Sequence, residues 1–248
     1  MTDKVIGVLG GMGPEATIAF YSRLVAHTPA GRDQDHLRVL IDSNPGIPDR
    51  TAAILGRGES PVPAMVRGID GLRGAGADFV AIPCVSAHAF VDELKASAGL
   101  PILSILDVVA QAIERHPRRI RSVGLMGTTG TLRAGMFQRR LAEAGFEVVV
   151  PGAEDQARVQ ASIYAVKAGA PEAVRRQLTA ELRSIAMRLT SLGAEGIVLG
   201  CTEIPLVLGQ ADLAVPVFDS LHLLARAAIR SAGREPVAVE SEEPRSRE

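Results

Sequence analysis

The segment "GADFVAIPC" (Gly76–Cys84) places a short apolar run between the glycine that ends a helical pattern and a cysteine. The segment "GAEGIVLGC" (Gly193–Cys201) repeats this order 117 residues later. Aligning "VIGVLGGMG" (Val5–Gly13) with "SVGLMGTTG" (Ser122–Gly130) gives the same offset of 117 residues. One offset shared by two separate segments indicates an internal duplication. The sequence therefore predicts two related lobes, each with a glycine-rich strand end and a cysteine.

Strand and helix patterns alternate along the whole chain. The run Val5–Leu9 breaks into glycines and is followed by "PEATIAFYSRLVAHT", where apolar residues recur at helical spacing. Strands separated by helices of about ten or more residues require a mostly parallel sheet with both faces covered, so the predicted fold class is α/β. Further strands are expected at Leu37–Asp42, Asp78–Pro83, Pro101–Ile105, Ser122–Gly127, Glu147–Pro151, Gly196–Gly200 and Val215–Ser220.

The two pseudo-symmetric lobes are expected to divide the chain unequally. The first lobe takes residues 1–105 and, late in the chain, about 215–233, and the second takes 106–214. The late return is expected because "VPVFDSLHLL" resembles "LPILSILDVV" and would complete the first sheet. The tail, 234–248, loses periodicity and is rich in charge and proline, which predicts disorder.

Composition excludes several classes of function. The 248 residues are 47% hydrophobic and 22% charged with a net charge of −1, so nothing attracts the chain to nucleic acid or to anionic lipid. No apolar stretch reaches the roughly 20 residues that span a bilayer, and the N-terminus has no signal-peptide layout. We expect a cytoplasmic protein whose two cysteines are thiols.

The paired cysteines are the main candidates for chemistry. A single free cysteine is most often a small buried hydrophobe. Ligands of open α/β sheets, however, bind beyond the carboxyl ends of the strands, and two lobes about a twofold axis would place Cys84 and Cys201 across one cleft. A thiolate and a thiol on opposite sides of a carbon acid can remove a proton from one face and return one to the other. Backbone N–H groups at helix N-termini would help to hold the thiolate.

Metal and hydrolase chemistry fit the pattern less well. Zinc sites need locally spaced ligands, whereas the five histidines are scattered. A nucleophilic pair of Cys84 with His88 has no evident third partner, and whether His88 contacts the site stays open.

A dinucleotide site is a further alternative. Gly11, Gly13 and Ala16 fit a G-x-G-x-x-A pattern after a strand, and Asp42 ends the next strand. Pro14 removes one N–H from the phosphate-facing turn, and a nicotinamide enzyme would leave the paired cysteines unexplained.

Six motifs together resemble the cofactor-independent aspartate/glutamate racemase family: "GVLGGMGPEAT", "SNPGIPDRT", "IPCVSAH", "GTTGTL", "IYAVKAG" and "LGCTEIPLVL". The likeness extends in order over nearly the whole chain up to the tail. It implies that Cys84 and Cys201 are the catalytic acid/base pair, that no cofactor or metal takes part, and that the protein is a homodimer. The substrate contacts implied by the resemblance are Met12, Arg50, Val85, Ser86, Thr129, Thr131, Lys167 and Thr202.

One departure from the family pattern bears on the substrate. Arg50 and Lys167 can pair with carboxylates, as racemisation of aspartate or glutamate needs. The family usually reads Cys-Asn-Thr after the first strand, but this chain reads Cys84, Val85, Ser86. An asparagine amide can donate to a carboxylate and accept from an ammonium, whereas valine does neither. Racemisation of an acidic amino acid is the expected reaction. Isomerisation or decarboxylation of a related diacid, and binding of a small anion without catalysis, are the alternatives.

Overall fold

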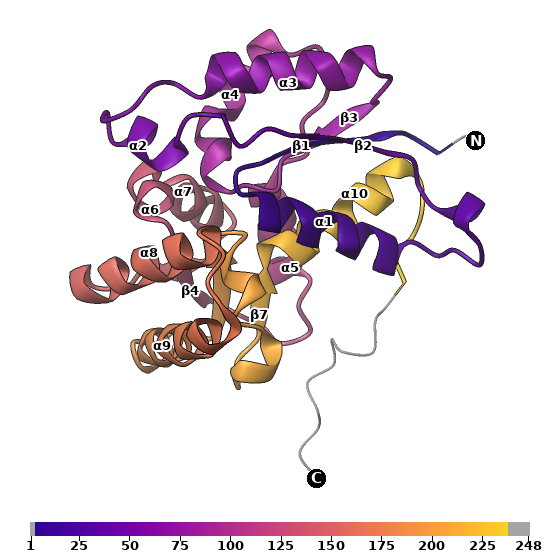
Figure 1. The fold of residues 1–248 in the computed structure, drawn as a ribbon. Helices are drawn as coiled ribbons and strands as arrows, with labels where there is room; N and C mark the ends of the chain where they lie inside the picture. Colours follow the sequence, from indigo (N-terminus) through magenta and orange to yellow (C-terminus); the bar gives the residue numbers. More distant parts are fainter. Residues whose placement is uncertain (1–2, 238–248) are drawn as a thin grey trace.

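The computed structural model describes residues 3–237, which form an α/β fold with two parallel sheets (Figure 1). The first sheet has the strand order β2-β1-β3 and the second β5-β4-β6-β7, which confirms the predicted fold class. The strands of the first sheet are β1 (Ile6–Gly10), β2 (Val39–Ser43) and β3 (Phe79–Ala81). Those of the second are β4 (Ser122–Gly127), β5 (Glu147–Val149), β6 (Gly196–Gly200) and β7 (Val217–Asp219).

Helices cover both sheets, and their starts follow ordinary capping rules. Pro14 opens the first helix, and the side chains of Asp49, Ser104, Thr128 and Asp219 each accept from a backbone N–H in the first turn of a later one. The helices are α1 (Pro14–His27), α2 (Arg50–Ile54), α3 (Val62–Gly74), α4 (Val91–Ser97), α5 (Ile105–Glu114), α6 (Thr129–Ala134), α7 (Met136–Glu143), α8 (Ala153–Lys167), α9 (Glu172–Ser191) and α10 (Ser220–Ala232). Short 3-10 helices are η1 (Asp33–Asp35), η2 (Ser86–Phe90), η3 (Ile204–Leu206) and η4 (Gln210–Asp212). None of the helices described here is long and apolar enough to cross a membrane.

Two expected elements differ from the structure. The pattern over 131–145 predicts one helix, but Gly135 adopts the left-handed conformation (φ +65°) and divides it into α6 and α7. The strand expected at Pro101–Ile105 is reduced to a single parallel bridge between Val80 and Ile102.

The duplication recurs in the detail of the two lobes. Gly76 and Gly193 both have positive φ, of 94° and 102°, where α3 and α9 end before a strand. Two residues after each glycine an acidic side chain accepts from a backbone N–H next to the neighbouring strand. Asp78 accepts from Val5, and Glu195 accepts from Arg121, both at 2.6 Å. Each lobe therefore fixes its cysteine-bearing strand in the same way.

The expected return of 215–219 to the first sheet is wrong. β7 pairs in parallel with β6, with Ile197 opposite Val217, so this strand completes the second sheet. The physical reason is that the buried edge of β6 needs backbone partners, and Ile197 N–H donates to Pro216 O at 2.8 Å. The likeness of "VPVFDSLHLL" to "LPILSILDVV" is thus a third trace of the duplication.

The helix that follows β7 nevertheless packs against the first lobe. α10 contacts α1 and α5, and α5 in turn contacts α7 and β7 of the second lobe. Helices α5 and α10 therefore lie at the interface between the lobes, where one buried apolar cluster holds residues of both sheets such as Val8 and Val123. The lobes are joined by a shared core.

The start of the expected disordered tail is also placed too early. Arg234 bonds Asp3 at 3.0 Å, and Val237 N–H donates to His27 O at 2.9 Å, so 234–237 is fixed against the first lobe. The remainder of the predicted tail, 238–248, lies outside the described residues.

Candidate active site

The two cysteines follow equivalent strands in the two lobes. Cys84 lies between β3 and η2, and Cys201 lies between β6 and η3. Both are buried, at 3% and 5% exposure. Because both loops leave the carboxyl end of a parallel strand, they occupy the position where α/β sheets bind ligands.

The first thiol is held through its backbone by His88. His88 Nδ1 lies 3.0 Å from Cys84 O, and its Nε2 lies 3.3 Å from Ile105 N and 3.4 Å from Leu103 O. Burial lowers the pKa of His88, in keeping with a neutral ring. The Cys84 thiol itself lies 3.5 Å from Ser86 Oγ. His88 therefore fixes the Cys84 loop to the start of α5.

The second thiol faces a buried carboxylate. Cys201 Sγ donates to Glu203 Oε2 at 3.0 Å, and Glu203 is 1% exposed. Burial and the neighbouring Glu203 carboxylate together raise the pKa of Cys201 well above its usual value. Cys201 is therefore held as the protonated thiol.

Glu203 and Lys167 connect this thiol to the first lobe. Gly13 N–H donates to Glu203 Oε1 at 3.0 Å, and Lys167 Nζ lies 3.4 Å from the same oxygen. Lys167 also donates to Met12 O at 3.0 Å. Burial lowers the pKa of Lys167, but the Glu203 carboxylate opposes this, and the pKa is raised overall.

Arg50 approaches the same Met12 carbonyl from the first lobe. It is 7% exposed, and its NH1 donates to Ile47 O at 2.9 Å and to Pro48 O at 2.8 Å. Its NH2 donates to Met12 O at 3.3 Å, while its Nε is buried with no hydrogen-bond partner among the described residues. The guanidinium is thus pre-positioned with one donor free.

The threonines after β4 build the start of α6. Thr128 Oγ1 accepts from Thr131 N–H at 3.0 Å, and the two hydroxyl oxygens are also 3.0 Å apart. Thr129 N–H donates to Gln160 Oε1 of α8 at 2.7 Å. α6 packs against both α2 and η2, so the helix that carries Thr129 and Thr131 lies next to the first lobe (Figure 1).

The residues directly after the cysteines have different surroundings. Thr202 Oγ1 donates across the lobes to Pro83 O at 3.1 Å. Val85 is 2% exposed and belongs to the shared apolar core, so its side chain packs among hydrophobic residues. The sequence-predicted residues Cys84, Cys201, Met12, Arg50, Lys167 and Thr202 are thereby linked through one set of contacts around the Met12 carbonyl and the cysteine loops.

Glu203 is one of the polar residues that follow the second cysteine, and the sequence leaves open whether it takes part. The duplication pairs it with Ser86, since each lies two residues after a cysteine. Extending the repeat past the cysteines shows the asymmetry, because the second lobe has a carboxylate where the first has a hydroxyl.

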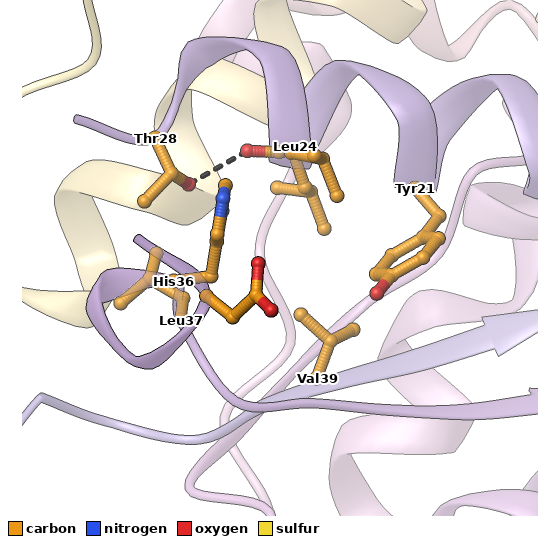
Figure 2. A pocket seen from close by; sticks show the side chains of 8 residues that line it. Tyr21, Leu24, Thr28, His36, Leu37 and Val39 are labelled. Carbon is orange, nitrogen blue, oxygen red and sulfur yellow. Dashed lines mark hydrogen bonds between the residues drawn. The ribbon is translucent and has the colours of Figure 1, made fainter. Parts of the chain in front are cut away.

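A separate pocket of about 310 Å³ lies between α1, η1 and β2 (Figure 2). Tyr21, Leu24 and Val39 contribute apolar walls, and the Thr28 hydroxyl donates to Leu24 O at 2.6 Å. None of the candidate site residues lines it. Among residues 3–237 no group of three or more His, Cys, Asp or Glu is placed to hold a metal ion.

Two pseudo-symmetric α/β lobes with a buried thiol at the end of an equivalent strand in each define the class of this protein. The chain belongs to the Asp/Glu/Hydantoin racemase family, whose model matches residues 9–228. This confirms the resemblance found in the motifs and identifies the protein as an enzyme of the isomerase class. Independence from pyridoxal phosphate fits the family.

Individual relatives agree with this assignment. The broad specificity amino-acid racemase RacX of Bacillus subtilis is 28% identical over 229 residues, covering 91% of this chain and 96% of that protein. The aspartate racemase of Picrophilus torridus superposes with a TM-score of 0.84 at 31% identity, covering 94% of this chain and 96% of that one. An aspartate racemase homologue from Pyrococcus horikoshii has a TM-score of 0.73 at 29% identity, covering 93% and 100%. These relatives support amino-acid racemase activity.

Proposed function

We propose that the chain racemises an acidic amino acid such as aspartate or glutamate without a cofactor, with Cys84 and Cys201 as its two acid/base groups. The observation that carries the proposal is the pair of buried thiols at equivalent strand ends, on loops that the Thr202 hydrogen bond to Pro83 O joins across the lobes. A single structural cysteine would not need a counterpart in the other lobe.

The proposed reaction has two proton transfers. A thiolate on one side of the substrate takes the α-proton and becomes a thiol, which leaves a carbanion stabilised by the adjacent carboxylate. The thiol on the opposite side then gives its proton to the other face and becomes a thiolate. One proton is removed and one is returned, so the substrate is inverted and the two cysteines have exchanged protonation states.

The cations of the site would hold the substrate carboxylates. Arg50 has a buried Nε donor free, and Lys167 is an ammonium shared between Glu203 and Met12 O. The proposed contacts also include the hydroxyls of Ser86, Thr129, Thr131 and Thr202 and the backbone at Met12. At Val85 the proposed contact is limited to the backbone, since its side chain packs in the core.

Substrate entry requires the two lobes to separate at the site. The thiols are 3% and 5% exposed, and polar contacts such as Lys167 with Met12 O and Tyr164 OH with Asp49 cross between the lobes. Hydrogen bonds to water can replace these polar contacts, whereas opening the apolar core around α5 and α10 would expose hydrophobic surface to water. We therefore place the hinge at the α5–α10 side of the interface.

The test is a chiral assay across a panel of acidic and neutral amino acids in deuterated solvent with no added cofactor. The proposal predicts inversion with deuterium at the α-carbon for aspartate or glutamate, and loss of inversion in both Cys84→Ser and Cys201→Ser, because a serine hydroxyl is far too weak an acid to replace the thiol. Neutral amino acids are included because the relative RacX is named for broad specificity.

The same assay separates the alternatives. A protein that only binds small anions would give no exchange, and a diacid isomerase or decarboxylase would act on dicarboxylates without inverting any amino acid. Near-normal racemisation by either cysteine variant would overturn the two-base mechanism. The implied homodimer and cytoplasmic location stay predictions.

A further inference from the structure

The duplicated lobes differ in charge two residues after each cysteine. Two residues after each cysteine the first lobe has Ser86 and the second has Glu203. We infer that Glu203 makes the two thiols unequal: its carboxylate keeps the proton on Cys201, so that Cys84 is the thiolate of the resting enzyme. This inference rests on the proposed function and adds a positioning residue that acts through Cys201.

The contacts of Glu203 require it to be an acceptor. Its Oε2 accepts from Cys201 Sγ at 3.0 Å, and its Oε1 accepts from Gly13 N–H at 3.0 Å and lies 3.4 Å from Lys167 Nζ. A thiol, a backbone amide and an ammonium are all donors, and the Thr202 hydroxyl also donates to Oε2 at 3.3 Å, so each of these neighbours offers Glu203 a proton. These contacts favour the carboxylate form, with Lys167 as its counter-ion.

An ionised Glu203 penalises a thiolate at Cys201. With the proton removed, two negative groups would face each other at 3.0 Å in a site where both are buried. At Cys84 the corresponding neighbour is a hydroxyl, Ser86 Oγ at 3.5 Å, which can donate to a thiolate. At Cys201 the Glu203 carboxylate raises the pKa of the thiol, and the Lys167 ammonium opposes this. Negative charge is therefore more favourable on Cys84.

The asymmetry has a defined kinetic consequence. The resting form has Cys84 as thiolate and Cys201 as thiol, and after one turnover these states are exchanged. Each enantiomer reacts with one of the two enzyme forms. The relative populations of these two forms therefore set kcat and KM separately for racemisation of the L and of the D enantiomer. The ratio kcat/KM must be the same in both directions, because the equilibrium constant between enantiomers is one. Removing the Glu203 charge should therefore change the ratio of the two kcat values and leave that equality intact.

The test is alkylation of the native protein by iodoacetamide over a pH series, with each cysteine peptide quantified by mass spectrometry. In the protein without substitutions, Cys84 should be labelled at lower pH than Cys201. In Glu203→Gln, which keeps the shape and the acceptor oxygen, the midpoint for Cys201 should fall by about one pH unit or more, with that of Cys84 little changed. Glu172→Gln, an exposed carboxylate on α9, should shift neither midpoint.

Two results would overturn the inference. One is labelling of Cys201 at lower pH than Cys84 in the protein without substitutions, a measurement that does not depend on whether a variant folds. The other is a folded Glu203→Gln protein with an unchanged Cys201 midpoint and an unchanged ratio of kcat values, as a purely structural link between the lobes would give. Alkylation requires no turnover, so the inference can fail while racemisation is observed, and it can hold when racemisation is not.

Discussion

The hydroxyl of Thr202 donates a hydrogen bond of 3.1 Å to the carbonyl of Pro83, and each of these residues is the immediate neighbour of a cysteine. The loop that carries Cys201 is thereby bonded directly to the loop that carries Cys84. Because the bond crosses from one lobe to the other, it fixes the relative position of the two thiols in the closed state. The distance across the site is thus set by a side chain as well as by the shared apolar core.

Replacing Thr202 with valine tests this link. The shape is kept, but Pro83 O loses a buried donor, which should lower the free energy of unfolding by about 1–3 kcal/mol. If the bond sets the spacing of the thiols, kcat/KM should fall further, by up to about 100-fold. Urea unfolding and steady-state racemisation measure the two effects. Thr179→Val is the matched control, since Thr179 Oγ1 donates to Val207 O within the second lobe. If Thr179→Val lost activity and Thr202→Val did not, the hydrogen bond from Thr202 to Pro83 O would not set the spacing of the thiols.

The contact between α6 and α2 offers a second test of lobe closure. A Cβ at Gly130 would lie 2.8 Å from Thr51 Oγ1 and 2.9 Å from Thr51 Cα, too close for any carbon. Gly130→Ala should therefore push the lobes apart and lower kcat/KM by about tenfold or more. Gly71→Ala on α3 meets nothing within 4 Å and should stay active. Equal activities of the two variants would mean that this contact is not needed for catalysis.

The sequence predicts the features that the duplication repeats. The two parallel sheets and the equivalent positions of Cys84 and Cys201 follow from one offset, because local strand and turn patterns are the same in both copies. The same repetition caused the error over Val215–Ser220. Its likeness to the first lobe predicts that it belongs to that lobe, whereas in the structure it pairs with β6 of the second sheet.

The contacts between lobes could not be predicted in this way. Lys167 reaches Met12 O, and Glu203 reaches Gly13 N–H, over separations of 155 and 190 residues. Such bonds depend on how two finished lobes pack, which no local periodicity encodes. The burial of Val85 in the shared core is of the same kind, since it arises from the packing of both sheets together.

Val85→Asn separates a packing role from a role in substrate choice. The family pattern has asparagine here, and the sequence alone predicts a gain of activity on aspartate or glutamate. The structure changes that expectation: an amide in the shared apolar core has no partner in place and should cost about 1–3 kcal/mol of unfolding free energy. Val85→Thr, which keeps the shape and adds one hydroxyl, is the comparison. An Asn variant as stable as the parent and more active on aspartate would show that the side chain can turn into the site.

The pairing of His27 with His222, whose rings are 4.7 Å apart between α1 and α10, predicts how stability depends on pH. Burial, then the nearby His27, Arg23 and Arg226, lower the pKa of His222 to about 3. In the unfolded chain a histidine has a pKa of about 6.5. Well above pH 6.5, His222 is neutral in both the folded and the unfolded chain, so its titration does not change the free energy of unfolding. Between about 6.5 and 3 the unfolded chain binds a proton that the folded chain does not.

Stability should therefore fall as the pH is lowered through this window, by up to about 1.4 kcal/mol per pH unit from His222. Urea unfolding at pH 7.5, 6.5, 5.5 and 4.5 measures the slope. His222→Gln cannot bind a proton at this position, so its free energy of unfolding should decline less steeply with falling pH. The difference between the two free energies at pH 7.5 measures the effect of the substitution on packing, and it is subtracted from the differences at lower pH. Buried His88, whose pKa is also lowered, leaves a residual slope in both proteins. Parallel curves for the two proteins would show that His222 accepts a proton in the folded state, and that the interface between α1 and α10 tolerates a positive charge.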